Sequence, residues 1–230
     1  MDIILVPGLW LDASSWEGVA PALERAGHTP RPLTLPGVGE PAERSAGIGI
    51  QDWVDAVVAE IDAASAPVAL VGHSGGGNVV WGAAEARADS LARVILLDTI
   101  PAPDGQGISE FPVVDGVVPF PGWDSFDEPD VADLDAETRR RWSARTHSVP
   151  ARVPTDPLRL DGTRRHGVPV TLLMGGMDES EFREAVAQWG PWGEEFAAIG
   201  EAEVVRLGSG HWPQFSQPDA VAQAILEALR

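Results

Sequence analysis

The residues best suited to chemistry lie in a glycine-rich turn at 72–76, which reads Gly-His-Ser-Gly-Gly. The turn follows the apolar run 68–71 and precedes a helix-compatible stretch. A G-x-S-x-G pattern between a strand and a helix holds its serine in a strained backbone and exposes the Oγ atom. The flanking glycines are expected because a Cβ at Gly72 or Gly76 would strike the neighbouring strand or helix. We therefore predict that Ser74 is a nucleophile.

A nucleophilic serine needs a base to accept its proton, and the chain holds five histidines. His211 lies on a loop directly after the strand-like segment 202–207, where it can reach a serine that leaves another strand of the same sheet. His73 occupies the middle of the glycine-rich turn and is expected to point away from the serine. The remaining histidines are interpreted as structural: His28, His147 and His166. We predict His211 as the base.

Two aspartates compete for the role of orienting the base. Asp178 lies on a turn after the strand candidate 168–174, and Asp98 ends the preceding strand candidate 93–98. We favour Asp178, because an aspartate on a turn after the later strand best fits the Ser…Asp…His chain order of this turn type. Asp98 stays open as the rival, and its alternative interpretation is a strand-end carboxylate or a local cap. Glu179 is a lesser contender.

The amino-terminal segment 3–16 and the glycine-rich turn together resemble the α/β-hydrolase family, and the resemblance covers nearly all of the chain. Members with a serine nucleophile usually carry His-Gly at the end of the first core strand, where this chain has Pro7-Gly8. The resemblance implies an oxyanion hole formed by the backbone N–H groups of Leu9 and Gly75. The proline removes one N–H group but neither of these two.

Strand-like and helix-like segments alternate along the chain, as in an α/β-hydrolase fold. The expected strands are 2–6, 29–34, 67–72, 93–98, 168–174 and 203–207, and the expected helices are 15–26, 51–64, 75–88, 180–189 and 218–229. This alternation predicts a mostly parallel six-stranded sheet with helices on both faces and a ligand at the carboxyl ends of the strands. We expect 1–100 and 166–230 to form the core and 101–165 to form a small lid insertion.

The predicted lid, residues 101–165, holds nine prolines and breaks the alternation. Long irregular insertions often cover active sites, and 135–145 is predicted to form a lid helix. Four tryptophans are candidates for contacting a substrate: Trp10, Trp212, Trp123 and Trp142. The alternative for Trp10, Trp123 and Trp142 is packing of the lid on the core.

The composition excludes several classes of partner and site. The net charge is −19, which argues against nucleic acids and anionic membranes as partners. No motif for a cofactor or a metal is present, so we expect none. No apolar run is long enough to span a membrane, and the first strand begins at residue 2, so we expect no signal peptide. The chain has no cysteine, which is compatible with a cytoplasmic protein, either a monomer or a homodimer.

The residues and the resemblance imply a serine hydrolase that cleaves a carboxylic ester or a lactone of a small, mostly apolar substrate through an acyl-enzyme. Trp212 beside the base also resembles carbon–carbon bond hydrolases of ring-cleavage products, which stay open as an alternative. A ligand-binding member of the family with little turnover is a third interpretation. The hydroxynitrile lyase-like members carry a lysine beside the base, and this chain has no lysine at all.

Overall fold

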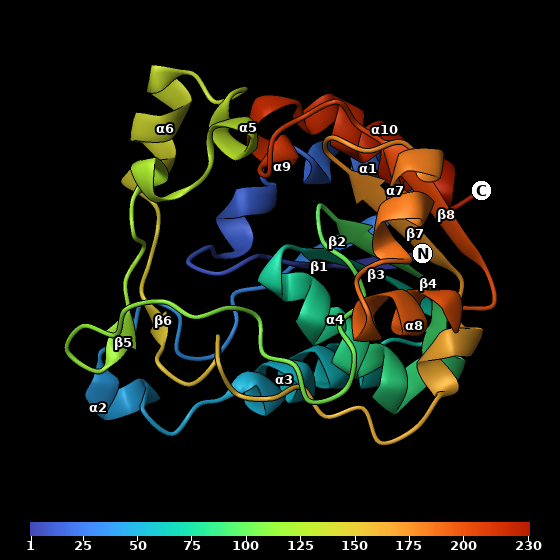
Figure 1. Ribbon diagram of the computed structural model, residues 1–230, viewed down its shortest axis with the longest axis horizontal. Helices are drawn as coiled ribbons and strands as arrows, with labels where there is room; N and C mark the ends of the chain where they lie inside the picture. Colours follow the sequence, from blue (N-terminus) through green and yellow to red (C-terminus); the bar gives the residue numbers. More distant parts are fainter.

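Six parallel strands form the central sheet in the order β2-β1-β3-β4-β7-β8. The computed structural model describes all residues from 1 to 230 (Figure 1). The strands are β1 Asp2–Val6, β2 Thr29–Pro32, β3 Val68–His73, β4 Leu91–Leu97, β7 Val170–Met174 and β8 Ala202–Arg206. The predicted six-stranded parallel sheet and its six strand positions are therefore confirmed.

The strand sequences explain the layered arrangement. The inner strands are apolar on both faces, as expected where helices cover a parallel sheet on both sides. Alternate residues of β1 go to opposite faces: Ile4 and Val6 pack into one core cluster, and Ile3 and Leu5 into the other. β2 contains two prolines and lies at the edge of the sheet, because proline cannot donate a hydrogen bond to a strand on each side.

Helices cover both faces of the sheet (Figure 1). Side chains of α3, α4, α7 and α8 pack into the larger core cluster, and those of α1 and α10 into the smaller one. The α-helices outside 101–165 are α1 Ala20–Arg25, α2 Ala42–Ser45, α3 Ile50–Asp62, α4 Gly75–Arg87, α7 Glu179–Val186, α8 Pro191–Ala197, α9 Pro213–Ser216 and α10 Pro218–Ala228. None of the helices is both long and apolar enough to cross a membrane.

The helix predicted at 15–26 is interrupted in the structure. A short 3₁₀ helix, η1 (Ala13–Trp16), precedes α1, and Pro21 lies in the first turn of α1. Proline has no N–H group to donate to the preceding turn, so a helix that contains it begins there instead of continuing through it. The other short 3₁₀ helices are η2 Ala88–Ser90, η3 Trp123–Ser125 and η4 Arg164–Gly167.

Residues 101–165 hold two short helices and a small second sheet. The helices are α5 Glu128–Val131 and α6 Ala136–Ser143, and the antiparallel sheet pairs β5 Val117–Val118 with β6 Val149–Pro150. α6 lies within the predicted lid helix, and its N-terminus is capped by Asp135, which accepts a hydrogen bond from Thr138 N. We refer to residues 101–165 as the cap.

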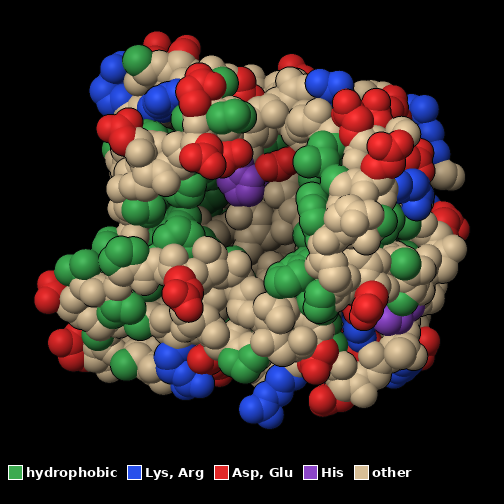
Figure 2. All heavy atoms as spheres, viewed as in Figure 1, with side chains coloured by type: hydrophobic (Ala, Val, Ile, Leu, Met, Phe, Trp, Pro, Cys, Tyr) green, Lys and Arg blue, Asp and Glu red, His purple; other side chains and the backbone are tan.

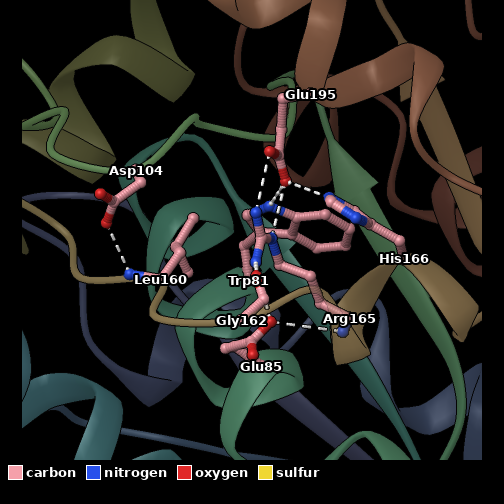
Figure 3. A network of polar contacts seen from close by, with 8 residues as sticks. All are labelled: Trp81, Glu85, Asp104, Leu160, Gly162, Arg165, His166 and Glu195. Carbon is pink, nitrogen blue, oxygen red and sulfur yellow. Dashed lines mark hydrogen bonds and ion pairs between the residues drawn. The ribbon is translucent and has the colours of Figure 1, made fainter.

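A buried ionic network ties the chain that leaves the cap to the core (Figure 3). Arg165 is almost fully buried and binds Glu85 of α4 at 2.8 Å and Glu195 of α8 at 2.7 Å. Glu195 also accepts hydrogen bonds from Trp81 and His166, each at 2.9 Å. Burial raises the pKa of the Glu195 carboxyl, but the bonds from Arg165, His166 and Trp81 outweigh it, so that this pKa lies below its usual value. The network is fully paired, which is the condition for a buried charge to be tolerated.

Candidate active site

The glycine-rich turn lies between β3 and α4, as predicted. Ser74 has φ +50° and ψ −126°, a region that residues with a side chain rarely adopt. A Cβ on Gly72 would lie 2.6 Å from the carbonyl oxygen of Gly76, and one on Gly76 would overlap the carbonyl oxygen of Pro7. The chain can therefore turn this sharply only with glycine at both positions, and the turn presents the Ser74 side chain at the carboxyl end of the sheet.

His211 follows β8 and reaches the serine across the end of the sheet. Its Nε2 atom lies 2.9 Å from Ser74 Oγ. Its backbone N–H donates to the carbonyl oxygen of Asp130 at 2.8 Å, so the cap holds the loop that carries it. The structure thus brings together the two residues that the sequence predicted as nucleophile and base.

The acid that contacts His211 is Asp98, not Asp178. Asp98 Oδ2 lies 2.6 Å from His211 Nδ1, and Asp98 Oδ1 accepts a hydrogen bond from Gly175 N at 2.8 Å. Burial raises the pKa of this carboxyl, but the bond and the charge of His211 and the bond from Gly175 outweigh it, and the pKa falls below its usual value. Asp98 is therefore an anion that fixes the Nδ1–H tautomer of His211.

Asp178 has a different position, and the expectation that it orients His211 is wrong. It is the N-cap of α7, where it accepts a hydrogen bond from Glu181 N while its own N–H donates to Glu181 Oε2. This reciprocal pair satisfies helix N–H groups and leaves the carboxylate at the surface. Glu179 pairs with Arg183 on the same helix at 2.8 Å.

Strand order explains why Asp98 is the partner. β4 is paired directly with β3, and Ser74 N donates to the carbonyl oxygen of Leu97 at 3.1 Å. The residue after Leu97 is therefore already beside the nucleophile. Asp98 has φ +47°, a conformation that aspartate tolerates better than most residues. Asp178 lies beyond the end of β7, which is a strand farther from the serine.

The predicted oxyanion donors are Leu9, on the loop after β1, and Gly75, at the start of α4. The N–H of Leu9 has no acceptor among the backbone bonds of the loops, and the N–H of Gly75, at the first position of α4, has no acceptor within the helix. The two residues adjoin, since a Cβ on Gly75 would lie 3.2 Å from Leu9 Cγ. Both groups are therefore available to an oxygen near Ser74.

A cap histidine braces the same loop, which the sequence did not reveal. The N–H of His147 donates to the carbonyl oxygen of Trp10 at 2.9 Å, and His147 Nε2 lies 2.9 Å from Asp12 Oδ2. Trp10 itself has φ +65°. His147, interpreted from the sequence as structural, thus stabilises the loop in which Pro7-Gly8 replaces the usual His-Gly pair.

His73 supports the base from behind. It is buried, its Nε2–H donates to the carbonyl oxygen of His211 at 2.8 Å, and Gln214 Nε2 lies 3.2 Å from its Nδ1. Burial, followed by the charge of His211, lowers the pKa of His73 to about 3. It therefore stays neutral near pH 7, and its structural role agrees with the interpretation from the sequence.

Two acidic residues of the cap attach to the loop of His211. Asp133 Oδ2 accepts hydrogen bonds from Gly210 N at 2.9 Å and from Ser216 Oγ at 2.6 Å, and Asp130 supplies the backbone acceptor for His211. Burial, followed by the negative charges of Asp98 and Asp127, raises the pKa of the Asp130 carboxyl, although His211 opposes this shift. Figure 2 shows red acidic side chains around a purple histidine at the edge of a hollow.

The hollow leads to a cavity of about 200 Å³ above the serine. Its wall combines the candidate catalytic groups with apolar side chains, which are Leu9, Trp10, Ile108, Phe111, Phe126 and Trp212. Trp10 and Trp212, which were predicted to contact a substrate, line this cavity. No arginine contributes to the wall.

Trp123 and Trp142 do not line the cavity, and their prediction as substrate contacts is corrected. Trp123 packs edge-on against Trp212 with ring centroids 5.0 Å apart, and its Nε1–H donates to the carbonyl oxygen of Arg139 at 2.8 Å. Trp142 stacks on Phe215 at 3.8 Å. Both residues pack the cap against the loop and helix that follow His211, and the burial of their large aromatic rings stabilises this contact.

The structure shows no arrangement of three or more His, Cys, Asp or Glu side chains that could hold a metal ion. The site therefore offers a serine, an imidazole and a carboxylate in a continuous hydrogen-bonded chain, with two free N–H groups nearby. Such a set can activate an oxygen nucleophile and stabilise an oxyanion.

Comparison with known proteins agrees with this fold. The model of the alpha/beta hydrolase family matches residues 3–224. A carbendazim hydrolyzing esterase of Nocardioides sp. (strain SG-4G) is 31% identical over 109 residues, which are 46% of this chain and 45% of that protein. The alignment thus spans less than half of the relative's length.

Solved structures show the same fold. An extracellular alpha/beta-hydrolase from a Paenibacillus species, described as sharing structural and functional homology with tobacco salicylic acid binding protein 2, has a TM-score of 0.78 at 19% identity and covers 99% of this chain and 98% of its own. A methylesterase from Arabidopsis has a TM-score of 0.71 at 20% identity, with 100% and 98% covered. A pyrethroid hydrolase from Sphingobium faniae has a TM-score of 0.67 at 19% identity, with 99% and 96% covered. With the family model matching almost the whole chain, the protein belongs to the alpha/beta hydrolase family.

Proposed function

We propose that the protein is a serine hydrolase that cleaves a carboxylic ester or lactone of a small, mostly apolar, uncharged substrate. The observation that carries the proposal is the hydrogen-bonded chain from Ser74 Oγ through His211 to Asp98, with links of 2.9 and 2.6 Å, at the bottom of the cavity. The names of the esterases and hydrolases similar to this chain support the same reaction class.

The reaction begins when Ser74 Oγ attacks the ester carbonyl carbon and its proton passes to His211 Nε2. Asp98 holds Nδ1–H and stabilises the imidazolium. The N–H groups of Leu9 and Gly75 stabilise the oxyanion, and the loss of one such donor typically lowers kcat by about 10²–10³. The imidazolium then protonates the leaving alcohol as the C–O bond breaks, which leaves an acyl group on Ser74.

Water completes the cycle. His211 Nε2 takes one proton from the water as its oxygen attacks the acyl carbon, and the same proton returns to Ser74 Oγ when the acid leaves. A lactone follows the same steps, except that its alcohol stays attached to the acyl group. The carboxylate product is repelled by Asp98 and by the acidic residues around His211, which favours its release.

Cavity size and lining limit the substrate. A volume of about 200 Å³ is below the roughly 300–1,000 Å³ of sites for drug-sized ligands. The apolar part of the wall contributes binding through burial, at about 25 cal/mol per Å² of apolar area. Small esters with a hydrocarbon or aromatic portion are therefore expected to be better substrates than long or anionic ones.

Substitution of Ser74 by alanine tests the proposal. Ser74→Ala is expected to keep the fold and the melting temperature, to lose capture by a fluorophosphonate, and to lose turnover of small chromogenic esters by about 10⁴-fold or more. Steady turnover by the wild type separates a hydrolase from a ligand-binding protein, which could react with the fluorophosphonate yet not turn over. Unchanged ester turnover by Ser74→Ala would refute the assignment.

A further inference from the structure

The amide side chain of Asn78 lines the cavity without a partner in the protein. Asn78, on α4, is 7% exposed and lines the cavity, yet its amide donates to and accepts from no protein group. A primary amide offers two donors and one acceptor oxygen. The amide atoms of Asn78 are not among the fully enclosed polar atoms that lack a partner, so they are reached from the cavity, where water or a ligand can pair with them.

Asn78 lies on α4 close to the nucleophile and shares its cavity. α4 begins at Gly75, directly after Ser74, so that Asn78 lies one helical turn below the serine. Ser74 and Asn78 both line the cavity, whose volume is only about 200 Å³. A substrate whose carbonyl carbon lies at Ser74 Oγ therefore brings atoms two to three bonds away within reach of Asn78.

Thr99 adds a second polar group to the same part of the wall. It follows Asp98, is half-buried and lines the cavity. A Cβ on Gly77 would overlap Thr99 Cγ2 and would lie 3.4 Å from Thr99 Oγ1. Thr99 therefore packs on the first turn of α4, next to the residue that precedes Asn78.

The remaining wall restricts the chemistry of a partner group. Apart from Asp98 and the two histidines, no ionisable side chain lines the cavity, so nothing there would neutralise a charged group. An amide pairs best with a neutral group that both donates and accepts, such as an N–H beside a carbonyl, because two parallel hydrogen bonds then form.

We propose that Asn78, assisted by Thr99, forms a hydrogen-bonding subsite that selects esters carrying a neutral amide-like group, an N–H beside a carbonyl, two to three bonds from the scissile ester. The inference rests on the proposed hydrolase function and deepens it by naming the substrate class. An Asn78 amide bound only to water, with no influence on selectivity, is the alternative that the experiment must exclude.

Two pairs of esters test the subsite on both sides of the scissile bond. On the acyl side, methyl succinamate is compared with methyl 4-methylpentanoate, and on the alcohol side 2-carbamoylethyl acetate is compared with 3-methylbutyl acetate. In each pair the first ester carries a carboxamide group where the second carries an isopropyl group of similar shape. The ratio of kcat/KM, carboxamide over isopropyl, is measured for the wild type, Asn78→Leu, Thr99→Val and the surface control Gln51→Leu.

In Asn78→Leu the ratio is expected to fall roughly tenfold for at least one pair, since each neutral hydrogen bond contributes roughly 3- to 10-fold. Thr99→Val is expected to lower it by roughly threefold, and Gln51→Leu, which changes an exposed amide on α3, by less than twofold. A ratio unchanged within twofold for both pairs in Asn78→Leu overturns the subsite. Melting temperature and fluorophosphonate capture report whether each variant is folded.

A second measurement needs neither turnover nor a variant at Asn78. Asn78 is the only asparagine of the chain, so protein labelled with [¹⁵N]asparagine gives a single pair of side-chain amide signals in an NMR spectrum. In the Ser74→Ala protein these signals are expected to shift with the carboxamide ester and to shift little with its isopropyl counterpart. Equal shifts with both members overturn the subsite. Absence of ester turnover by the wild type would instead refute the hydrolase function, and this spectrum would still decide the subsite.

Discussion

Replacement of Asp98 by asparagine is the sharpest test of the proposed mechanism, because Asp98 oxygens accept hydrogen bonds on two sides. Oδ2 accepts from His211 Nδ1 at 2.6 Å and Oδ1 from Gly175 N at 2.8 Å. The asparagine side chain of Asp98→Asn would keep one oxygen. If that oxygen stays on Gly175, the new NH₂ group faces His211 Nδ1 and forces the proton of the imidazole onto Nε2, where it points at Ser74.

The cost of this change can be estimated from its two parts. An imidazole protonated at Nε2 cannot accept the Ser74 proton, and the imidazolium loses a charged partner in a partly buried site. In the well-studied serine proteases the equivalent change lowers kcat about 10⁴-fold. We expect a loss of about 10³–10⁴ here, which corresponds to about 4–5.5 kcal/mol in the activation free energy. The fold should persist, since the shape of the side chain is kept.

The assay measures kcat and KM on a small chromogenic ester for the wild type, Asp98→Asn and the matched control Asp178→Asn. Asparagine is as good an N-cap as aspartate, so the control should change kcat by less than twofold. A loss confined to kcat in Asp98→Asn supports the reasoning. The reasoning would be refuted if Asp98→Asn kept more than a tenth of the wild-type kcat while Asp178→Asn lost most of the wild-type kcat.

Three other perturbations test the surroundings of the site. Asp133→Ala removes the acceptor of Gly210 N and should lower kcat/KM roughly 10- to 100-fold by misplacing His211. The control Asp135→Ala, which removes the N-cap of α6, should change kcat/KM by less than twofold. Equal losses in both variants would argue against a role of Asp133 in positioning the loop of His211. The pKa of His73 is about 3 in the folded protein, below its ordinary 6.5. Between pH 7 and pH 5 the unfolded chain therefore binds a proton at His73 that the folded protein does not. This difference should lower the unfolding free energy by about 2 kcal/mol over that range. Urea titrations of His73→Gln should lack that part of the fall, and an identical pH dependence would contradict the assignment. Gly76→Ala places a Cβ against the carbonyl oxygen of Pro7 and should lower the unfolding free energy by about 1–3 kcal/mol or more, measured as a lower melting temperature. Gly47→Ala, where a Cβ meets open space, should leave the melting temperature unchanged. Comparable losses in both variants would show that backbone crowding is not the cause.

The sequence was sufficient for the features that depend on local pattern. The strands were predictable because their apolar runs alternate with helical segments, and the turn around Ser74 because glycine is needed where backbones approach closely. His211 followed from its place after the last strand. The boundaries within 101–165 were less accessible, because short elements such as β5 and β6 depend on contacts between residues far apart in the chain.

The acid was missed because its position depends on strand order. Asp98 and Asp178 both follow strands that end at the same edge of the sheet, and no local pattern distinguishes them. Only the pairing of β3 with β4 places Asp98 next to Ser74. His147 and Asp133 were missed for a related reason: each acts through backbone groups of a loop more than 70 residues away, and single histidines or aspartates in an irregular segment carry no signal of such contacts.

The contacts of the cap bear on how a substrate enters. Hydrogen bonds from the cap hold both loops of the site: Asp130 and Asp133 bind the loop of His211, and His147 binds the loop after β1 at Trp10 and Asp12. If the cap lifted as a unit, these four bonds would break, and at about 0.5–1.5 kcal/mol each the opening would cost about 2–6 kcal/mol before the loss of aromatic packing. It would also release His211 and the loop after β1 from their positions. We therefore expect a substrate to enter through the hollow seen in Figure 2 while the cap stays in place, and the cap to limit substrate size as a fixed part of the site.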